Sequence, residues 1–109
     1  MSAIVKKSVF KNLSFNKKYN IIGDFDFFIK TSMTSKIGYI AEPLGLYRIH
    51  DSNFSLKNMK MHIEELSSWI QFNNSKLKKK GFSLNKQRIF LIKLIKKYYL
   101  KKIFNFFSV

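Results

Sequence analysis

Apolar side chains recur at helical spacing near the start of the chain. Four of them fall at positions i, i+3, i+4 and i+8: Phe25, Phe28, Ile29 and Met33. This spacing predicts an amphipathic helix from Asp24 to about Ser35, because residues three and four apart share one face of a helix.

Two further helical patterns occur in the second half of the chain. The first has spacings of three and four residues through Leu56, Met59, Ile63, Leu66 and Ile70. It predicts a helix that ends before Gly81, since glycine is common just after a helix C-terminus. The second pattern runs through Ile92, Ile95, Tyr99, Ile103 and Phe106. It predicts a helix from about Leu84 to Phe104.

Three short segments have the composition of β-strands. They are "SAIV" (residues 2–5), "KIGYI" (36–40) and "LGLYRIH" (44–50). Leu44, Leu46, Arg48 and His50 would share one face of the last segment, because strand side chains alternate. The first half is therefore predicted to contain both strands and helices, and the second half to be helical.

Charge divides the chain into two regions. The formal net charge is +15, and lysine supplies 19 of the 21 basic residues. Residues 1–65 hold ten basic and all six acidic side chains, whereas residues 66–109 hold eleven basic and none acidic. The C-terminal region is therefore the one that would attract anionic partners.

The apolar segments are short. None reaches the roughly 18 uninterrupted apolar residues that a membrane-spanning helix requires. The N-terminus "MSAIVKKSVF" lacks the long apolar region of a signal peptide. From these two features we expect a protein made and kept in the cytoplasm. The lack of cysteine excludes disulfides and thiolate metal sites but leaves the redox compartment undecided.

The stretch "IIGDFDFFIK" (residues 21–30) holds two carboxylates one residue apart, Asp24 and Asp26. Three interpretations fit it. A D-x-D pair holds a divalent metal on a diphosphate in sugar-nucleotide enzymes. Alternatively, one carboxylate is a catalytic base. In the third interpretation the pair is only the polar start of a helix, with Asp24 as N-cap and Asp26 favoured by the helix dipole.

The order of motifs around this pair resembles the acceptor-side half of family-2 glycosyltransferases. The resemblance rests jointly on "FNKKYNIIGDFDFFIK", "KIGYIAEPLGLYRIH" and "DSNFS", and it covers about residues 2–55. It implies an α/β fold: the C-terminal half of a GT-A domain at residues 1–55, followed by a basic amphipathic helical region, a helical hairpin, at residues 56–109.

By this resemblance Asp24 is the general base of an inverting sugar transfer. Gly23 stands where the family often has glutamate, so only Asp24 carries the role over. Asp26 would lie near the acceptor or brace the helix. In this family the metal-binding D-x-D lies far upstream of the base motif, and the sequence after Asp26 matches the family's sequence downstream of the base.

Arg48 and His50 also receive roles from the resemblance. His50 would approach the metal or the donor diphosphate, and Arg48 would meet a phosphate or brace the cleft. Arginine suits a phosphate because its planar fork forms two parallel hydrogen bonds. The alternative is structural, with His50 bonded to a turn and Arg48 paired with Glu42 or Asp51.

The resemblance also implies partners and a cofactor. The complete enzyme would transfer a sugar from a nucleotide-sugar donor to a glycan acceptor in bacterial surface-glycan synthesis, with Mg²⁺ or Mn²⁺. The family's nucleotide-binding half and its metal-binding D-x-D have no counterpart in this sequence. We therefore expect this chain alone to hold no metal and to be inactive.

The basic region permits three interpretations. Its lysines and aromatic residues, at 76–104, could dock on an anionic membrane surface at the inner face of the cytoplasmic membrane. They could bind nucleic acid, although arginine is scarce and no nucleic-acid-binding motif is present. They could also be the solvated face of a helical hairpin. On the helix before this region, His62 and Glu65 are three residues apart and could begin a metal site. Because no third ligand is present, we expect a solvated pair instead.

Overall fold

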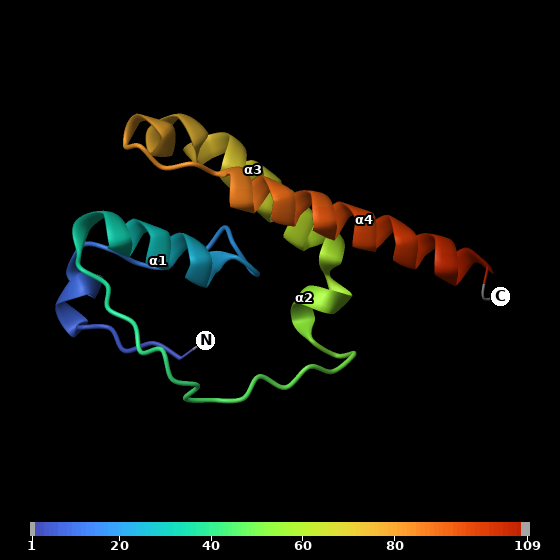
Figure 1. Cartoon of the computed structure of the whole chain (residues 1–109), viewed down its shortest axis with the longest axis horizontal. Helices are drawn as coiled ribbons and strands as arrows, with labels where there is room; N and C mark the ends of the chain where they lie inside the picture. The colour runs from blue at the N-terminus through green and yellow to red at the C-terminus, as the bar shows by residue number, and fades with distance from the viewer. Residues whose placement is uncertain (1, 108–109) are drawn as a thin grey trace. The chain divides into compact units, whose positions relative to one another are not determined.

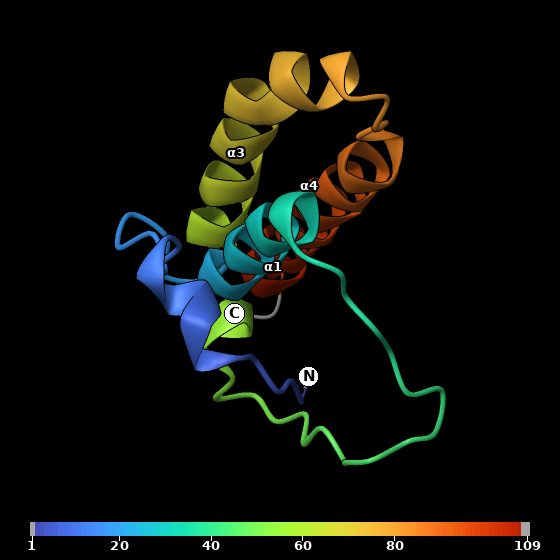
Figure 2. The same ribbon diagram turned by 90° about the vertical axis from the view of Figure 1, so that its left-hand side faces the viewer.

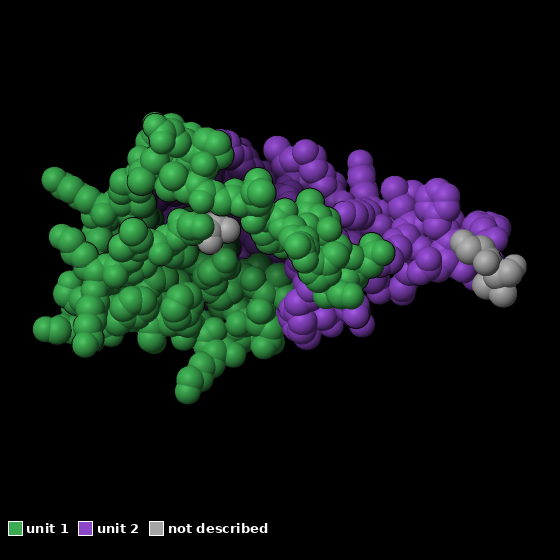
Figure 3. Space-filling model, turned by 90° about the horizontal axis from the view of Figure 1, so that it is seen from below, with its two compact units in different colours: residues 1–53 green, residues 54–109 purple. Residues whose placement is uncertain are grey.

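The computed structural model describes residues 2–107 and is helical (Figure 1). In chain order the elements are the 3-10 helix η1 (Lys7–Lys11) and the α-helices α1 (Gly23–Thr34), α2 (Phe54–Lys57), α3 (Met59–Lys79) and α4 (Asn85–Phe107). They form two compact units, Met1–Asn53 and Phe54–Val109 (Figure 3). We call these unit 1 and unit 2.

Unit 1 is built around helix α1, which confirms the helix predicted from the apolar spacing. Its central side chain is Phe27, which is fully buried. The ring of Phe27 stacks on Phe15 at a centroid distance of 4.4 Å and on Phe10 at 5.2 Å. Stacked aromatic pairs contribute about 0.5–1.5 kcal/mol beyond the area they bury. This cluster therefore fixes the chain before α1 against the helix.

The start of α1 differs from the prediction. Ile22 is the N-cap residue, and its own side chain makes no capping hydrogen bond. Asp24 lies inside the first turn, where its Oδ1 accepts a hydrogen bond from the adjacent Phe25 N–H at 2.7 Å. The prediction that Asp24 is the N-cap is therefore wrong, although both aspartates do lie in the positive first turn.

The predicted α/β fold is wrong, and so is its assignment as half of a GT-A domain. Residues 2–107 contain no strand. The segments at 2–5, 36–40 and 44–50 have no regular structure, and residues 36–50 are exposed throughout. A strand needs a neighbour that accepts and donates its backbone hydrogen bonds. The described chain provides none for these segments, so their strand-like composition does not produce a sheet.

Unit 2 confirms the two helices predicted in the second half, with different bounds. The predicted first helix is divided at Asn58 into the short α2 and the long α3. The core of unit 2 consists of large apolar side chains that are buried along α3 and just before α4: Met59, Leu66, Trp69, Ile70, Leu77 and Leu84.

Helices α3 and α4 run in opposite directions and contact each other. Residues 80–84 first lead the chain back along α3 (Figures 1 and 2). As a result, the first half of α4 lies against α3, whereas its last turns extend past the N-terminal end of α3. No residue in the described part of α4 is buried.

The turn after α3 is a Schellman motif centred on Gly81. The Gly81 N–H donates to Lys78 O at 3.0 Å, and the Phe82 N–H donates to Leu77 O at 2.9 Å. These bonds satisfy two carbonyl groups that a helix end would otherwise leave free. Gly81 has a φ of +83°, in the left-handed region that favours glycine.

We predict that Gly81→Ala lowers the free energy of unfolding of unit 2. A Cβ at residue 81 would meet no neighbour within 4 Å, so the cost is conformational and amounts to about 1–2 kcal/mol. Gly38→Ala is the matched control, because residue 38 also has open space and lacks a positive φ. Denaturant unfolding of both variants measures the difference. Equal stability of the two would contradict the role assigned to the turn.

Candidate functional site

The two aspartates of α1 have different surroundings although they lie in the same turn. Asp26 is 2% exposed, and its Oδ2 forms an ion pair with Lys30 Nζ at 2.6 Å. Asp24 is exposed, and its contact is the short hydrogen bond from Phe25 N–H. Of the two carboxylates, Asp24 is thus the one that a dissolved substrate can reach, whereas Asp26 is engaged within the helix.

Arg48 and His50 lie on the exposed, irregular segment before α2. The backbone carbonyl of His50 accepts a hydrogen bond from Asn53 N–H at 3.0 Å, which closes the turn at residues 50–53. In the described part of unit 1, no hydrogen bond or ion pair joins Asp24 to Arg48 or His50. The structure therefore does not assemble these three predicted site residues into one constellation.

Metal-ligating side chains are likewise not gathered. Residues 2–107 contain no group of three or more histidine, cysteine, aspartate or glutamate side chains placed to hold a metal ion. The donor set around His50 thus does not fit a metal site in this chain. The assignment of His50 as a metal ligand stays a prediction about a larger assembly.

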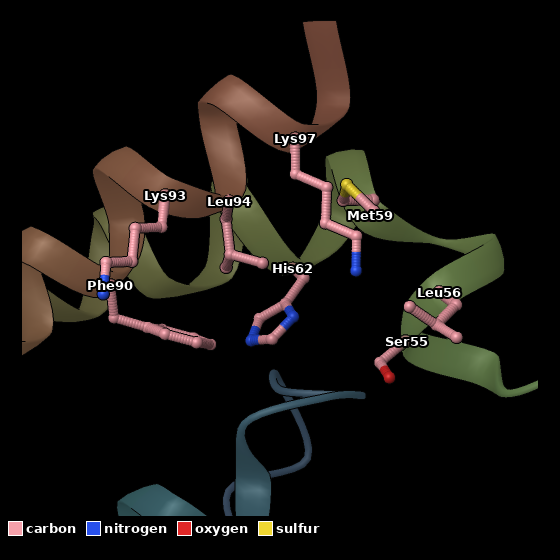
Figure 4. Close-up of a pocket in the computed structure, with 8 residues that line it drawn as sticks. All are labelled: Ser55, Leu56, Met59, His62, Phe90, Lys93, Leu94 and Lys97. Atoms are coloured by element: carbon pink, nitrogen blue, oxygen red, sulfur yellow. The ribbon is translucent and has the colours of Figure 1, made fainter. Parts of the chain in front are cut away.

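Unit 2 contains a groove with a volume of about 300 Å³ (Figure 4). Helices α2, α3 and α4 all contribute to it. The lining residues are Ser55, Leu56, Met59, His62, Phe90, Lys93, Leu94 and Lys97. Four of these side chains are apolar, and the other four carry hydroxyl, imidazole or amino groups.

His62 lies at the centre of this groove, with its ring 5.8 Å from that of Phe90. Burial lowers the pKa of His62 below 6.5, and the negative charge of Glu65 opposes this in part. The sequence predicted a solvated His62–Glu65 pair. Glu65 does act on the histidine, but burial dominates and favours the neutral imidazole, which has one donor and one acceptor nitrogen.

One side of α4 is less exposed than the rest, and it is the side that contacts α3. Its residues are Gln87, Leu91, Leu94, Ile95 and Tyr98, and Leu84, just before the helix, continues the same side. A second apolar stripe lies on the opposite side of the helix, as the 100° advance per residue requires. It consists of Ile89, Ile92, Leu100, Ile103 and Phe107, each about half exposed or more. We call this set the outer stripe.

Sequence patterns did not separate the two faces of α4. The predicted stripe mixes Ile95, which is partly covered, with Ile92 and Ile103, which are exposed. Apolar residues occur nearly all round this helix, so spacing alone does not identify the packed side. Seven basic and no acidic side chains are distributed among them.

No helix in the described part of the chain is both long enough and apolar enough to cross a membrane. Comparison with protein-family models, with curated proteins and with solved structures gives no match to this chain.

We predict that Asp26→Asn destabilises unit 1 and that Asp24→Asn has a much smaller effect. Both changes remove a negative charge from the first turn, which costs about 0.3–1 kcal/mol through the helix dipole. Only Asp26→Asn also removes the charge that binds Lys30, and such hydrogen bonds contribute about 1.5–3 kcal/mol. Thermal unfolding followed by circular dichroism compares the pair. Equal losses would show that the buried ion pair adds no stability.

Proposed function

We propose that unit 1 supplies the acceptor-side carboxylate of an inverting glycosyltransferase. The sequence pattern from Phe15 to Ser55 supports this proposal, because it resembles that part of the family-2 enzymes. The observation that carries it furthest is the contrast within α1, where Asp24 is exposed and Asp26 is buried and ion-paired. A catalytic base must reach the substrate, and a buried partner can hold its helix in place.

In the proposed reaction, Asp24 takes the proton from an acceptor hydroxyl. The hydroxyl oxygen forms a bond to the anomeric carbon of the donor sugar as the bond from that carbon to the nucleoside diphosphate breaks. The leaving group departs with the electron pair, and the configuration at the anomeric carbon inverts. A general base of this kind typically contributes about 10²–10⁴-fold to the rate. The products are proposed to be bacterial surface glycans.

Other groups must come from outside the described residues. The nucleotide site and the ligands of a divalent metal are proposed to belong to another polypeptide segment. In the described part of unit 1, no three histidine, cysteine, aspartate or glutamate side chains are clustered to hold a metal ion. Arg48 and His50, which are exposed on a segment without regular structure, would then meet the donor diphosphate only in the assembled enzyme.

We predict that Asp24→Asn lowers kcat about 10²–10⁴-fold in a complete enzyme. The enzyme would be assembled by fusing this chain to the nucleotide-binding half of a family-2 glycosyltransferase, and release of nucleoside diphosphate would measure turnover. Asp51→Asn is the matched control, since Asp51 is also an exposed carboxylate of unit 1. Unchanged turnover in Asp24→Asn would rule out the general-base assignment.

A second function, membrane docking, is proposed for unit 2. The observation that favours it is the outer stripe of α4, which exposes apolar side chains on a helix with seven basic and no acidic residues. Such a helix lies in a membrane interface with its apolar side dipped toward the acyl chains. The lysines beside the stripe can extend their amino groups to the headgroups, as long cationic side chains commonly do.

The energies are sufficient for reversible binding. Each lysine near an anionic surface contributes about 1 kcal/mol. Full burial of a leucine or isoleucine side chain contributes about 1.5–3 kcal/mol. Because most side chains of the outer stripe are only about half exposed, each would contribute roughly half of this, and a few contacts of each kind together provide several kcal/mol. We place the protein at the inner face of the cytoplasmic membrane, where anionic lipids face the cytoplasm.

We predict that the chain binds anionic vesicles, and binds neutral vesicles much more weakly. Leu100→Gln should weaken binding about tenfold, because it removes one apolar contact worth about 1.4 kcal/mol. Leu46→Gln makes the same change at a fully exposed residue of unit 1 and should leave binding unchanged. Vesicle co-sedimentation at several salt concentrations measures both.

Two outcomes would contradict the membrane proposal. Equal binding to neutral and anionic vesicles would show that the basic side chains do not drive binding to anionic headgroups. Tighter binding to duplex DNA than to anionic vesicles at the same salt would favour the nucleic-acid interpretation instead.

A further inference from the structure

The groove in unit 2 brings amino, hydroxyl and imidazole groups to one apolar hollow. Figure 4 shows the Lys97 side chain extending from α4 into the space between His62 and Leu56. The Ser55 hydroxyl borders the same space from α2. Lys93 lies at the other end, beside Phe90. Donors from three helices thus surround a single opening.

The charge of the groove is wholly positive. None of its eight lining residues is acidic. Neither Lys93 nor Lys97 forms an ion pair with any described residue. Of the acidic residues of α3, Glu64 contacts Lys60 at 3.8 Å, and Glu65 acts on His62. The unpaired Lys97 amino group beside a hydroxyl and a half-buried imidazole favours an anion with several acceptor oxygens, and Lys93 adds a second positive charge at the other end of the groove.

The position of the two lysines on α4 connects the groove with the outer stripe. At 100° per residue, Lys93 and Lys97 lie between the outer stripe on one side and Phe90 and Leu94 on the other. If the outer stripe dips into a bilayer, these amino groups lie at headgroup level. The groove then opens at the depth of the lipid phosphates.

We propose that this groove binds the phosphate monoester of a membrane lipid. The phosphate lies against Lys97, Ser55 and His62, and the glycerol and first carbons of the lipid cover Phe90 and Met59. This inference rests on the proposed membrane docking of unit 2, and it adds selectivity for one headgroup class.

Size and charge favour a monoester. A volume of about 300 Å³ lies at the lower end of the range for small-molecule sites, which suits a phosphate with a glycerol group. A terminal phosphate has a second pKa near 6, so at pH 7 it carries between about 1.5 and 2 negative charges on three free oxygens. A diester phosphate carries one negative charge, and its headgroup alcohol occupies one of the oxygens that would otherwise accept hydrogen bonds.

The test compares vesicles that contain phosphatidate with vesicles that contain phosphatidylglycerol, adjusted to equal measured surface charge. We expect the chain to bind the phosphatidate vesicles about tenfold more tightly, as one additional charge-assisted hydrogen bond would provide. The variant with Lys93→Gln and Lys97→Gln should lose this preference. The matched control carries Lys86→Gln and Lys101→Gln, which remove the same charge from the same side of α4 outside the groove, and should retain it.

The outcomes separate the two proposals. If the chain binds neither kind of vesicle, membrane docking itself fails. If it binds both equally, docking stands and the groove proposal is overturned. If both double variants lose the preference, the preference depends on overall charge and the groove is likewise overturned. The lysines are exposed, so each variant should keep its helices, which circular dichroism would check.

A second measurement distinguishes a lipid from free phosphate. The imidazole signals of His62 are followed by NMR during addition of a short-chain, water-soluble phosphatidate or of inorganic phosphate. Phosphatidate should shift these signals and raise the pKa of His62, because a bound anion favours the imidazolium form. The signals of His50, in unit 1, serve as the control. An equal response of His62 to inorganic phosphate would overturn the assignment to a lipid.

Discussion

The structure depends on how each segment satisfies its backbone hydrogen bonds. A helix pairs its N–H and C=O groups within itself, whereas a strand needs a second strand beside it. Residues 23–34 and 54–107 contain helical segments that meet this requirement locally. Residues 36–50 do not, so they stay irregular and exposed. The described part of unit 1 therefore has one α-helix, and its core is the aromatic cluster around Phe27.

The same constraint explains how much of the fold was predictable. Apolar spacing correctly indicated the helices because it reports a property of one segment, as the buried Met59, Leu66 and Ile70 of α3 show. The strand predictions at 36–40 and 44–50 failed because alternation indicates a preference for strand and cannot show whether a neighbouring strand exists. The outer stripe of α4 was missed for a related reason, since apolar residues surround that helix and only its contact with α3 defines the inner side.

The candidate sites were predictable to a smaller extent. Asp24 and Asp26 are the same residue type, two positions apart, and the sequence could not show that one is exposed and the other ion-paired and buried. His62 was expected to be solvated, but residues of α4 about 30 positions later cover it. A sequence pattern on α3 alone contains no information about that contact.

The turn at Gly81 links the fold of unit 2 to both of its proposed interactions. The Schellman motif ends α3, and residues 80–84 then return along the helix before α4 begins. Because α4 starts part-way along α3, Phe90 reaches His62, and the groove forms where α2 meets both long helices. For the same reason, the last turns of α4 extend beyond α3, where Ile103 and Phe107 are exposed. An isolated helical end of this kind gains stability mainly from packing its apolar face against a partner. That end carries basic and no acidic side chains, so an anionic surface, the partner proposed for it, would suit both its apolar and its charged side chains.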